Sequence, residues 1–525
     1  MMDFDPQVIR RILVRQVNWV GDAVLTLPAL EALDGRFPLA EITLLARPWV
    51  AGLFAGHPAL DRMIEYRSED THRGLRGRWH LAATVKAGEF DLAVLFPNSM
   101  EAAVVPWLAG IPRRIGHPTD GRRCLLTHVV SNESAAGRHQ VEWYLDVARA
   151  LGAEGTRTVR LPVTEAVRRR SGELLRQYGI ASTGLLVALN PGSAYGNAKR
   201  WAADRFAAVA DRLVESRGAT ILLIGSEGER PVLDTVAAHM RRPSVNLGGC
   251  TDLPALVGVL ERANLLVSND TGAMHVAVAV GTPVLAIFGP TDAMATGPLG
   301  RCARVVCASV PCSPCLLREC PIDHRCMAGV TVPQVLQAAT SLLDAPPGAR
   351  APIAPGPFGP QWVPALGTPA AFLDRDGTII EDPGYLRDPE KLQFIPGAIE
   401  ALRGLQRAGY RLVLVSNQAG VARGLLTETD VHRVNDRLKA LLAEVGVRLD
   451  GIYFCPHHPD YGPPEYRREC DCRKPRPGLI HRAIRDLDLN PHRSVVIGDH
   501  ATDAALAGAF PGMVGIMLRT GHGAE

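Results

Sequence analysis

The sequence AFLDRDGT, residues 371–378, opens the last third of this 525-residue chain. A short apolar run ends at Leu373, and two carboxylates, Asp374 and Asp376, follow before Gly377 lets the backbone turn. In phosphoryl transfer, one such carboxylate attacks phosphorus, while the second protonates the leaving oxygen and later activates water. The pair alone is a weak signal, because a strand that ends in a solvated acidic turn has the same sequence.

Polar residues at the ends of later apolar runs strengthen the phosphoryl-transfer interpretation. Ser416, Asn417 and Gln418 follow the run at 412–415, Lys474 precedes a proline, and Asp499 follows the run at 494–497. Because the carboxyl ends of parallel strands meet at one edge of a sheet, we expect these side chains to converge on Asp374. Asp374 and Asp499, with the carbonyl oxygen of Asp376, are then predicted to hold Mg²⁺ by oxygen coordination.

Two short-spaced pairs of zinc-type ligands lie in the same part of the chain. Cys455 and His457 form a Cys-x-His pair, and Cys470 and Cys472 form a Cys-x-Cys pair. Four such ligands predict a closed tetrahedral site for structural Zn²⁺. The alternative is a set of unrelated surface thiols. Metal binding is favoured over disulfides because we expect the protein to be cytoplasmic, where thiols stay reduced.

These motifs, in this order, resemble the haloacid dehalogenase (HAD) phosphatase superfamily over residues 368–525. The cysteine loop, GYL at 384–386 and SNQAGVARG at 416–424 are similar to the heptose bisphosphate phosphatases and to their near relatives, the histidinol phosphatases. The resemblance implies removal of the 7-phosphate of D-glycero-D-manno-heptose 1,7-bisphosphate. Hydrolysis of histidinol phosphate or another small sugar phosphate is the alternative.

The same resemblance implies roles for individual residues. Asp374 is expected to be the nucleophile and Asp376 the general acid and base. Ser416 and Lys474 are expected to bind phosphate, and Asn417, Gln418, Arg423 and Arg473 are expected to contact the substrate. One position departs from the pattern: His500 follows Asp499 where the heptose phosphatases usually carry a lysine or arginine.

The first two thirds of the chain alternate short apolar strands with amphipathic helices. Strands are expected at 12–14, 42–45 and 92–96, and then at 185–190, 220–224, 265–268 and 284–288. This pattern predicts two doubly wound α/β domains that face each other. A segment rich in Pro and Gly follows and is typical of a linker. We expect domains at 1–170, 171–343 and 368–525, with the linker at 344–367.

Three loops in this region have the features of ligand sites at helix starts. Asp22, in VGDAVL at 20–25, sits where a carboxylate either accepts a proton or caps a helix. The loop LNPGS at 189–193, with nearby Lys199, and the segment SNDTGAMH at 268–275 are suited to binding phosphate groups through amides and a cation. Taken singly, each loop is more often an ordinary cap.

Together with IGSE at 224–227 and FGPTD at 288–292, these loops resemble the family 9 glycosyltransferases, most closely the lipopolysaccharide heptosyltransferases. The resemblance implies a GT-B fold of two facing Rossmann-like domains. It also implies inverting transfer from ADP-L-glycero-D-manno-heptose to a lipid-linked core oligosaccharide. In that site Asp22 is the general base, Ser193 and Lys199 meet the diphosphate, and Asp270, Thr271, Gly272 and His275 line the nucleotide-sugar pocket. A non-catalytic binding module is the alternative.

Two further groups of residues have alternative roles that the sequence leaves open. Arg113, Arg114, Arg122 and Arg123 would meet acceptor phosphates or lie on a solvated surface. Cys312, Cys315, Cys320 and Cys326 have a spacing that suits zinc or an iron–sulfur cluster, or are free thiols that pack a long loop.

Charge and hydropathy narrow the class of protein. The net charge of +3 gives no sign of nucleic-acid binding. The longest apolar stretch, at 276–288, is interrupted and too short to span a bilayer. The start of the chain lacks the pattern of a secretion signal. We therefore expect a cytoplasmic enzyme, with peripheral contact to the inner membrane as a possible addition.

Overall fold

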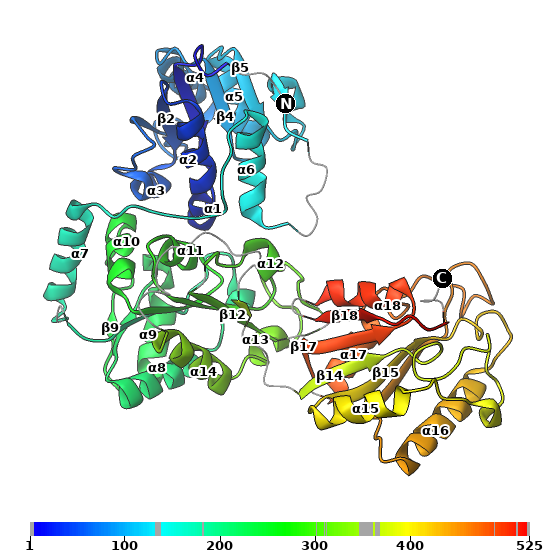
Figure 1. The fold of residues 1–525 in the computed structure, drawn as a ribbon. Coiled ribbons are helices and arrows are strands. Elements are labelled where there is room, and N and C mark those ends of the chain that lie inside the picture. The colour runs from blue at the N-terminus through cyan, green and yellow to red at the C-terminus, as the bar shows by residue number, and fades with distance from the viewer. Residues whose placement is uncertain are drawn as a thin grey trace. The chain divides into compact units, whose positions relative to one another are not determined.

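The computed structural model describes residues 5–131, 138–180, 183–300, 302–308, 310, 312–345, 361–362, 368–487, 489–510 and 513–521. These residues form three parallel sheets covered by helices (Figure 1). The chain divides into two compact units: the first holds two of the sheets and the second holds the third. Across the described residues, every helix is too short or too polar to cross a bilayer.

The first sheet has the strand order β3-β2-β1-β4-β5-β6, with all pairs parallel. Its strands are β1 (Arg11–Arg15), β2 (Glu41–Ala46), β3 (Arg62–Glu65), β4 (Leu92–Leu95), β5 (Arg113–Gly116) and β6 (His128–Val129). Its helices are α1 (Val20–Leu25), α2 (Leu27–Arg36), α3 (Pro48–Ala51), α4 (Gly74–Lys86), α5 (Met100–Leu108) and α6 (Gln140–Ala150). The order of the strands reverses between β1 and β4, and the loop after β1 leads to α1 and Asp22.

The second sheet has the order β13-β12-β11-β10-β7-β8-β9, and all its pairs are parallel. Read from β9, this is the strand order of the first sheet with one strand added at the end. Its strands are β7 (Leu186–Asn190), β8 (Thr220–Leu223), β9 (Val245–Asn246), β10 (Leu265–Asn269), β11 (Val284–Phe288), β12 (Ala303–Cys307) and β13 (Gln361–Trp362). Its helices are α7 (Glu165–Gln177), α8 (Ala203–Arg217), α9 (Arg230–His239), α10 (Leu253–Arg262), α11 (Gly272–Ala279), α12 (Ala293–Thr296), α13 (Arg325–Ala328) and α14 (Val332–Leu343). The reversal lies between β7 and β10, and both strands lead into predicted ligand loops.

The third sheet forms the core of the second unit, with the order β16-β15-β14-β17-β18 and all pairs parallel. Its strands are β14 (Thr368–Leu373), β15 (Arg411–Asn417), β16 (Gly451–Cys455), β17 (Leu489–Gly498) and β18 (Val514–Met517). Its helices are α15 (Ala398–Arg407), α16 (Glu428–Glu444), α17 (Gly478–Leu487) and α18 (Ala501–Leu506). Asp374 follows β14 and Asp499 follows β17, so these two carboxylates flank the reversal point, where open α/β sheets bind ligands.

The α/β class and the strands that apolar runs predicted are confirmed. β3, β5, β6, β9 and β13 were not predicted, since they are short and carry polar residues. β12 was also not predicted, although most of its residues are apolar. The expected linker at 344–367 falls largely outside the described residues, and the boundaries at 170, 343 and 367 stay predictions.

Candidate active sites

Lys474 links two carboxylates at the carboxyl edge of the third sheet. Its Nζ lies 2.7 Å from Oδ1 of Asp374 and 2.6 Å from Oδ1 of Asp503, and it also donates to the carbonyl oxygen of Val415 at 3.1 Å. Burial raises the pKa of Asp374 to about 6; the charge of Lys474 opposes this shift and the charge of Asp503 adds to it. Asp374 therefore combines a buried carboxylate with one tightly held counter-cation.

Three carboxylates at this edge have the chemistry of a divalent-cation site. Oxygen atoms of Asp374, Asp499 and Asp503 lie within 4.8 Å of one another. Two glycines leave room for Asp499, because a Cβ at Gly377 or Gly521 would lie 2.2 Å from its Oδ2. An all-oxygen, acidic donor set is the kind that Mg²⁺ prefers, so the residues present fit that ion.

Asp376 points away from this carboxylate group and into a separate hydrogen-bond network. Arg375, only 1 % exposed, donates from Nε and Nη2 to the two carboxylate oxygens of Asp376 at 3.0 and 2.9 Å. Its Nη1 reaches Asn435 Oδ1 at 3.0 Å, and its Nη2 also reaches Gln418 Oε1 at 3.0 Å. Gln418 Nε2 then donates to Asp376 at 2.9 Å and to Ser416 Oγ at 2.8 Å.

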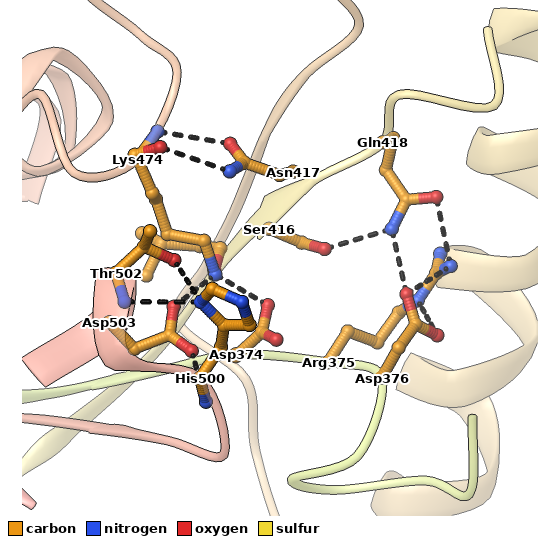
Figure 2. Close-up of polar contacts among 11 residues, drawn as sticks. Asp374, Arg375, Asp376, Ser416, Asn417, Gln418, Lys474, His500, Thr502 and Asp503 are labelled. Atoms are coloured by element: carbon orange, nitrogen blue, oxygen red, sulfur yellow. Dashed lines mark hydrogen bonds and ion pairs between the residues drawn. The ribbon is translucent and has the colours of Figure 1, made fainter. Parts of the chain in front are cut away.

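Figure 2 shows the two networks side by side: Asp374, Lys474 and Asp503 on one side, Arg375, Asp376 and Gln418 on the other, and Ser416 between them. Since Ser416 accepts a hydrogen bond from Gln418, its own hydroxyl proton remains available to a ligand. A pocket runs along these groups, and its lining also includes Asn417, Arg473, Asp499 and His500. The sequence predictions for this edge therefore converge on one cavity.

Three predicted substrate contacts have additional or different partners. Asn417 lines the pocket, but its side chain exchanges two hydrogen bonds with the backbone of Lys474, at 3.0 and 3.3 Å. Arg473 lines the pocket and donates to the carbonyl oxygen of His457. Arg423 is not among the residues that line this pocket, and its exposed guanidinium lies 4.4 Å from the ring centroid of Tyr461.

His500, where the motif departs from the heptose phosphatases, is the N-cap of α18. Its Nδ1 accepts from the backbone N–H of Thr502 at 3.2 Å. The following turn carries Asp503, four residues after Asp499. Sequence reasoning missed Asp503 and Arg375. Asp503 could have been found from its spacing, because it lies four residues after Asp499 in the first turn of α18. No such sequence pattern pointed to Arg375.

The four predicted zinc ligands come together. Nδ1 of His457 and the Sγ atoms of Cys455, Cys470 and Cys472 form one group within 4.8 Å, with Sγ–Sγ distances of 3.3 to 3.6 Å. His457 Nδ1 lies 3.3 Å from Cys472 Sγ. Three soft sulfur donors and one imidazole at this spacing fit a tetrahedral metal site.

In the first unit, Asp22 faces an ion pair that comes from the other sheet. Lys199 Nζ lies 2.6 Å from Asp270 Oδ2, which also accepts from the Thr291 hydroxyl at 2.7 Å. Burial raises the pKa of Asp22 to about 6; the Asp270 charge adds to this shift and the Lys199 charge opposes it. The structure thus places the predicted base within electrostatic reach of the predicted donor site.

The end of β7 and the loop after it carry two buried polar atoms without a hydrogen-bond partner among the described residues. Ser193 is 2 % exposed, and its hydroxyl has no hydrogen-bond partner among the residues described; Asn190 Oδ1 has none either. Asn190 Nδ2 reaches the hydroxyl of Thr271, the residue that precedes α11. Buried polar groups are normally paired, so this loop has the character of a ligand site.

Gly272 and His275 contact the first sheet's helix α1. A Cβ at Gly272 would lie 3.0 Å from Val20 Cβ, and one at Gly21 would lie 2.9 Å from His275 Cδ2. Burial lowers the pKa of His275 to about 4, so its imidazole is neutral near pH 7. Gly21 and Gly272 thus let α1 and α11 approach closely, and the place of Gly272 and His275 in the nucleotide-sugar pocket stays a prediction.

The structure describes contacts for one arginine and for the cysteine loop of the two groups that the sequence left open. Arg122 is fully buried and donates to the carbonyl oxygens of His117, Pro97 and Ser99, so it is neither an acceptor contact nor a surface residue. The four thiols of Cys312, Cys315, Cys320 and Cys326 are not among the metal-competent groups found in the described chain. Their loop contacts the Lys199 loop, because the carbonyl oxygen of Arg318 accepts from the N–H of Ala198 at 3.0 Å.

Comparisons with known proteins find relatives for both parts of the chain. Residues 78–325 match glycosyltransferase family 9 (heptosyltransferase), and residues 471–525 match the HAD-hydrolase-like family. The D-glycero-beta-D-manno-heptose-1,7-bisphosphate 7-phosphatase of Photorhabdus laumondii is 46 % identical over 155 residues, or 30 % of this chain and 82 % of that protein. The enzyme of the same name from Pasteurella multocida is 49 % identical over 134 residues, or 26 % of this chain and 72 % of that protein.

The first unit has a solved structural relative. The structure of E. coli ADP-heptose LPS heptosyltransferase II covers 63 % of this chain and 98 % of that chain, with 27 % identity and a TM-score of 0.54. The chain therefore belongs, in its C-terminal part, to the heptose bisphosphate phosphatase family of HAD-like hydrolases, and residues 78–325 in front of that part match glycosyltransferase family 9.

Proposed function

We propose that this chain performs two reactions of lipopolysaccharide inner-core heptose. The C-terminal part hydrolyses the 7-phosphate of D-glycero-D-manno-heptose 1,7-bisphosphate, and the first unit transfers heptose from ADP-L-glycero-D-manno-heptose to a lipid-linked core oligosaccharide. The observation that carries this proposal is the convergence of Asp374, Lys474 and Asp503 on one cavity, in the part that is 46 % identical to a heptose bisphosphate phosphatase.

Asp374 is the nucleophile in this proposal. Its carboxylate forms a bond to phosphorus as the bond from phosphorus to the sugar oxygen breaks, and Asp376 gives that oxygen its proton. Water then attacks the aspartyl phosphate while Asp376 takes back a proton, which releases inorganic phosphate and restores Asp374. Lys474 and the Ser416 hydroxyl bind the phosphate oxygens, and Asn417 holds the backbone of Lys474 in place.

Mg²⁺ supplies positive charge that offsets the phosphate charge when it is bound. Asp374 and Asp499 would hold it, with the carbonyl oxygen of Asp376, while Asp503 stays on Lys474. Arg375 and Gln418 hold the Asp376 carboxylate apart from this group, so its side chain is not a ligand of the cation in this proposal. Arg473 and Arg423 are left as candidate contacts to the rest of the sugar. Cys455, His457, Cys470 and Cys472 would hold a structural Zn²⁺.

In the transferase, Asp22 accepts the proton of the acceptor hydroxyl as that oxygen attacks the anomeric carbon. The bond from this carbon to the ADP oxygen breaks, so the configuration at the carbon inverts. The Ser193 hydroxyl and Lys199 stabilise the leaving diphosphate, and the N-terminus of α11, with Asp270 and Thr271, contributes to the donor site. We place the acceptor in residues 1–170, the donor in 171–343 and the reaction in the cytoplasm.

The test separates the two activities in one full-length protein. Phosphate release is measured from the heptose bisphosphate, and ADP release is measured with ADP-heptose and a core oligosaccharide acceptor. We expect Asp374→Asn to abolish phosphate release but not ADP release, and Asp22→Asn to do the reverse. If the parent protein releases neither phosphate from the heptose bisphosphate nor ADP from ADP-heptose with the acceptor, the proposal is wrong. If Asp22→Asn transfers heptose as fast as the parent, Asp22 is not the base.

A further inference from the structure

Helix α4 exposes its two largest apolar side chains on one face. Leu75 is 75 % exposed and Trp79 is 60 % exposed, and they lie four residues apart, one turn along the helix. The buried residues of this helix are Gly77, Leu81, Ala82 and Val85. Leu81, Ala82 and Val85 pack with residues of α5 over one face of the first sheet, whereas Leu75 and Trp79 stay exposed. Figure 1 shows α4 beside α5 in the first unit.

The same segment is purely basic. Arg73, Arg76, Arg78 and Lys86 lie between residues 71 and 88, a stretch that contains no aspartate or glutamate. None of these four cations has an ion pair in the described part of the chain, whereas Arg11, Arg62 and Arg67 of the same sheet region each pair with a glutamate. The α4 face therefore combines an exposed Trp–Leu pair with unneutralised positive charge.

We propose that the face formed by Arg73, Leu75, Arg76, Arg78, Trp79 and Lys86 docks the protein on an anionic phospholipid surface. A tryptophan and a leucine on a basic helix are the side chains that enter the boundary between headgroups and acyl chains, while arginines bind anionic headgroups. Charge complementarity favours a membrane over a protein partner here, because residues 71–88 contain no acidic side chain. The biological reason rests on the proposed function: a lipid-linked acceptor lies at a membrane, and α4 belongs to the acceptor half.

The experiment is co-sedimentation of the full chain with vesicles of phosphatidylglycerol and phosphatidylethanolamine, compared with phosphatidylcholine vesicles. We expect binding to the anionic vesicles that weakens as salt rises, since exposed charges are screened. Changing Arg73, Arg76 and Arg78 together to Gln should weaken binding on the order of a hundredfold, at about fivefold for each arginine. The pair Leu75→Ser and Trp79→Ser should weaken it about tenfold.

Matched controls come from the same half of the first unit. Changing Arg10, Arg11 and Arg62 together to Gln removes the same charge elsewhere, and Val8→Ser with Leu39→Ser removes two other exposed apolar side chains. These variants should bind as the parent does. Equal binding to neutral and anionic vesicles, or equal loss in the controls, would overturn the proposal. A change of oligomeric state in the Leu75→Ser, Trp79→Ser pair without vesicle binding would assign the face to a protein contact instead.

Vesicle binding is measured without sugar substrates, so its result is independent of the proposed transfer reaction. If the protein binds anionic vesicles but transfers no heptose, the docking surface stands and the proposed function fails. If it transfers heptose to a water-soluble acceptor but ignores vesicles, the docking surface fails and the function stands. When both hold, the α4 variants should raise the KM for a vesicle-embedded acceptor and leave the KM for the soluble one unchanged.

Discussion

The ammonium group of Lys474 lies 2.7 Å from Oδ1 of Asp374, and the two side chains are only 4 % and 13 % exposed. Burial lowers the pKa of Lys474, but its ion pairs with Asp374 and Asp503 outweigh that effect and raise the pKa above its usual value. The charged lysine therefore belongs to the folded state as well as to the reaction. Removing it leaves two buried carboxylates without their counter-charge.

Lys474→Met should accordingly lose both activity and stability. We expect phosphate release to fall by about a hundredfold or more and the free energy of unfolding of the second unit to fall by about 3–5 kcal/mol. The measurements are kcat/KM for phosphate release and urea unfolding. Lys439→Met, on the exposed side of α16, is the control and should change neither. Activity above half of the parent value would show that Lys474 does not serve the reaction.

Arg375 should act on the reaction through Asp376. Arg375→Lys cannot reproduce the paired hydrogen bonds to the carboxylate, so Asp376 should lose its fixed orientation. We expect kcat to fall by about ten- to a hundredfold, KM to stay within about twofold, and the acid–base limbs of the pH profile to shift. Arg387→Gln, an exposed arginine paired with Asp430 at 3.5 Å, should leave the profile unchanged. A variant that changes only thermal stability would assign Arg375 a structural role.

The pKa of Asp22 predicts the pH dependence of heptose transfer. Since burial raises this pKa to about 6, the base is deprotonated above that value, and transfer should fall as the pH drops below about 6. Asp270→Asn removes a negative neighbour, so the pKa should drop and the acidic limb should move to lower pH. Lys199→Met removes a positive neighbour and should move it to higher pH. The check is kcat/KM for ADP release between pH 4.5 and 9; limbs that move in the same direction in both variants would contradict this assignment.

The cysteine and histidine group predicts one bound zinc ion per chain. Cys472→Ser should reduce the zinc content measured by metal analysis and lower the melting temperature of the second unit. Phosphate release should fall with it, while heptose transfer by the first unit should remain. Cys124→Ser, an exposed thiol in the first unit, should change none of these properties. Full zinc content in Cys472→Ser would place the metal elsewhere.

Much of the fold follows from sequence because buried parallel strands are continuous apolar runs. The runs before Asp374, Ser416 and Asp499 placed each polar residue at the correct sheet edge, and the pattern of the zinc-type ligands was sufficient to group them. Short strands such as β6 (His128–Val129) carry no such signal, since they are formed through pairing with a neighbour.

The partners of individual side chains were harder to predict. Arg375 lies between two site carboxylates in sequence, yet its burial against Asn435 depends on α16, sixty residues later. Asn417 was expected to contact the substrate, but its side-chain amide forms hydrogen bonds with the backbone of Lys474. Lys199 and Asp270 were expected to meet the donor separately, and they pair with each other. Such choices depend on tertiary distances that local patterns do not contain.

The most direct test of the central claim is phosphate release by the full-length protein with Mg²⁺, using D-glycero-D-manno-heptose 1,7-bisphosphate and histidinol phosphate side by side. We expect a strong preference for the heptose bisphosphate, with release abolished in Asp374→Asn. A preference for histidinol phosphate would contradict the heptose assignment, and release that survives in Asp374→Asn would contradict the aspartate nucleophile.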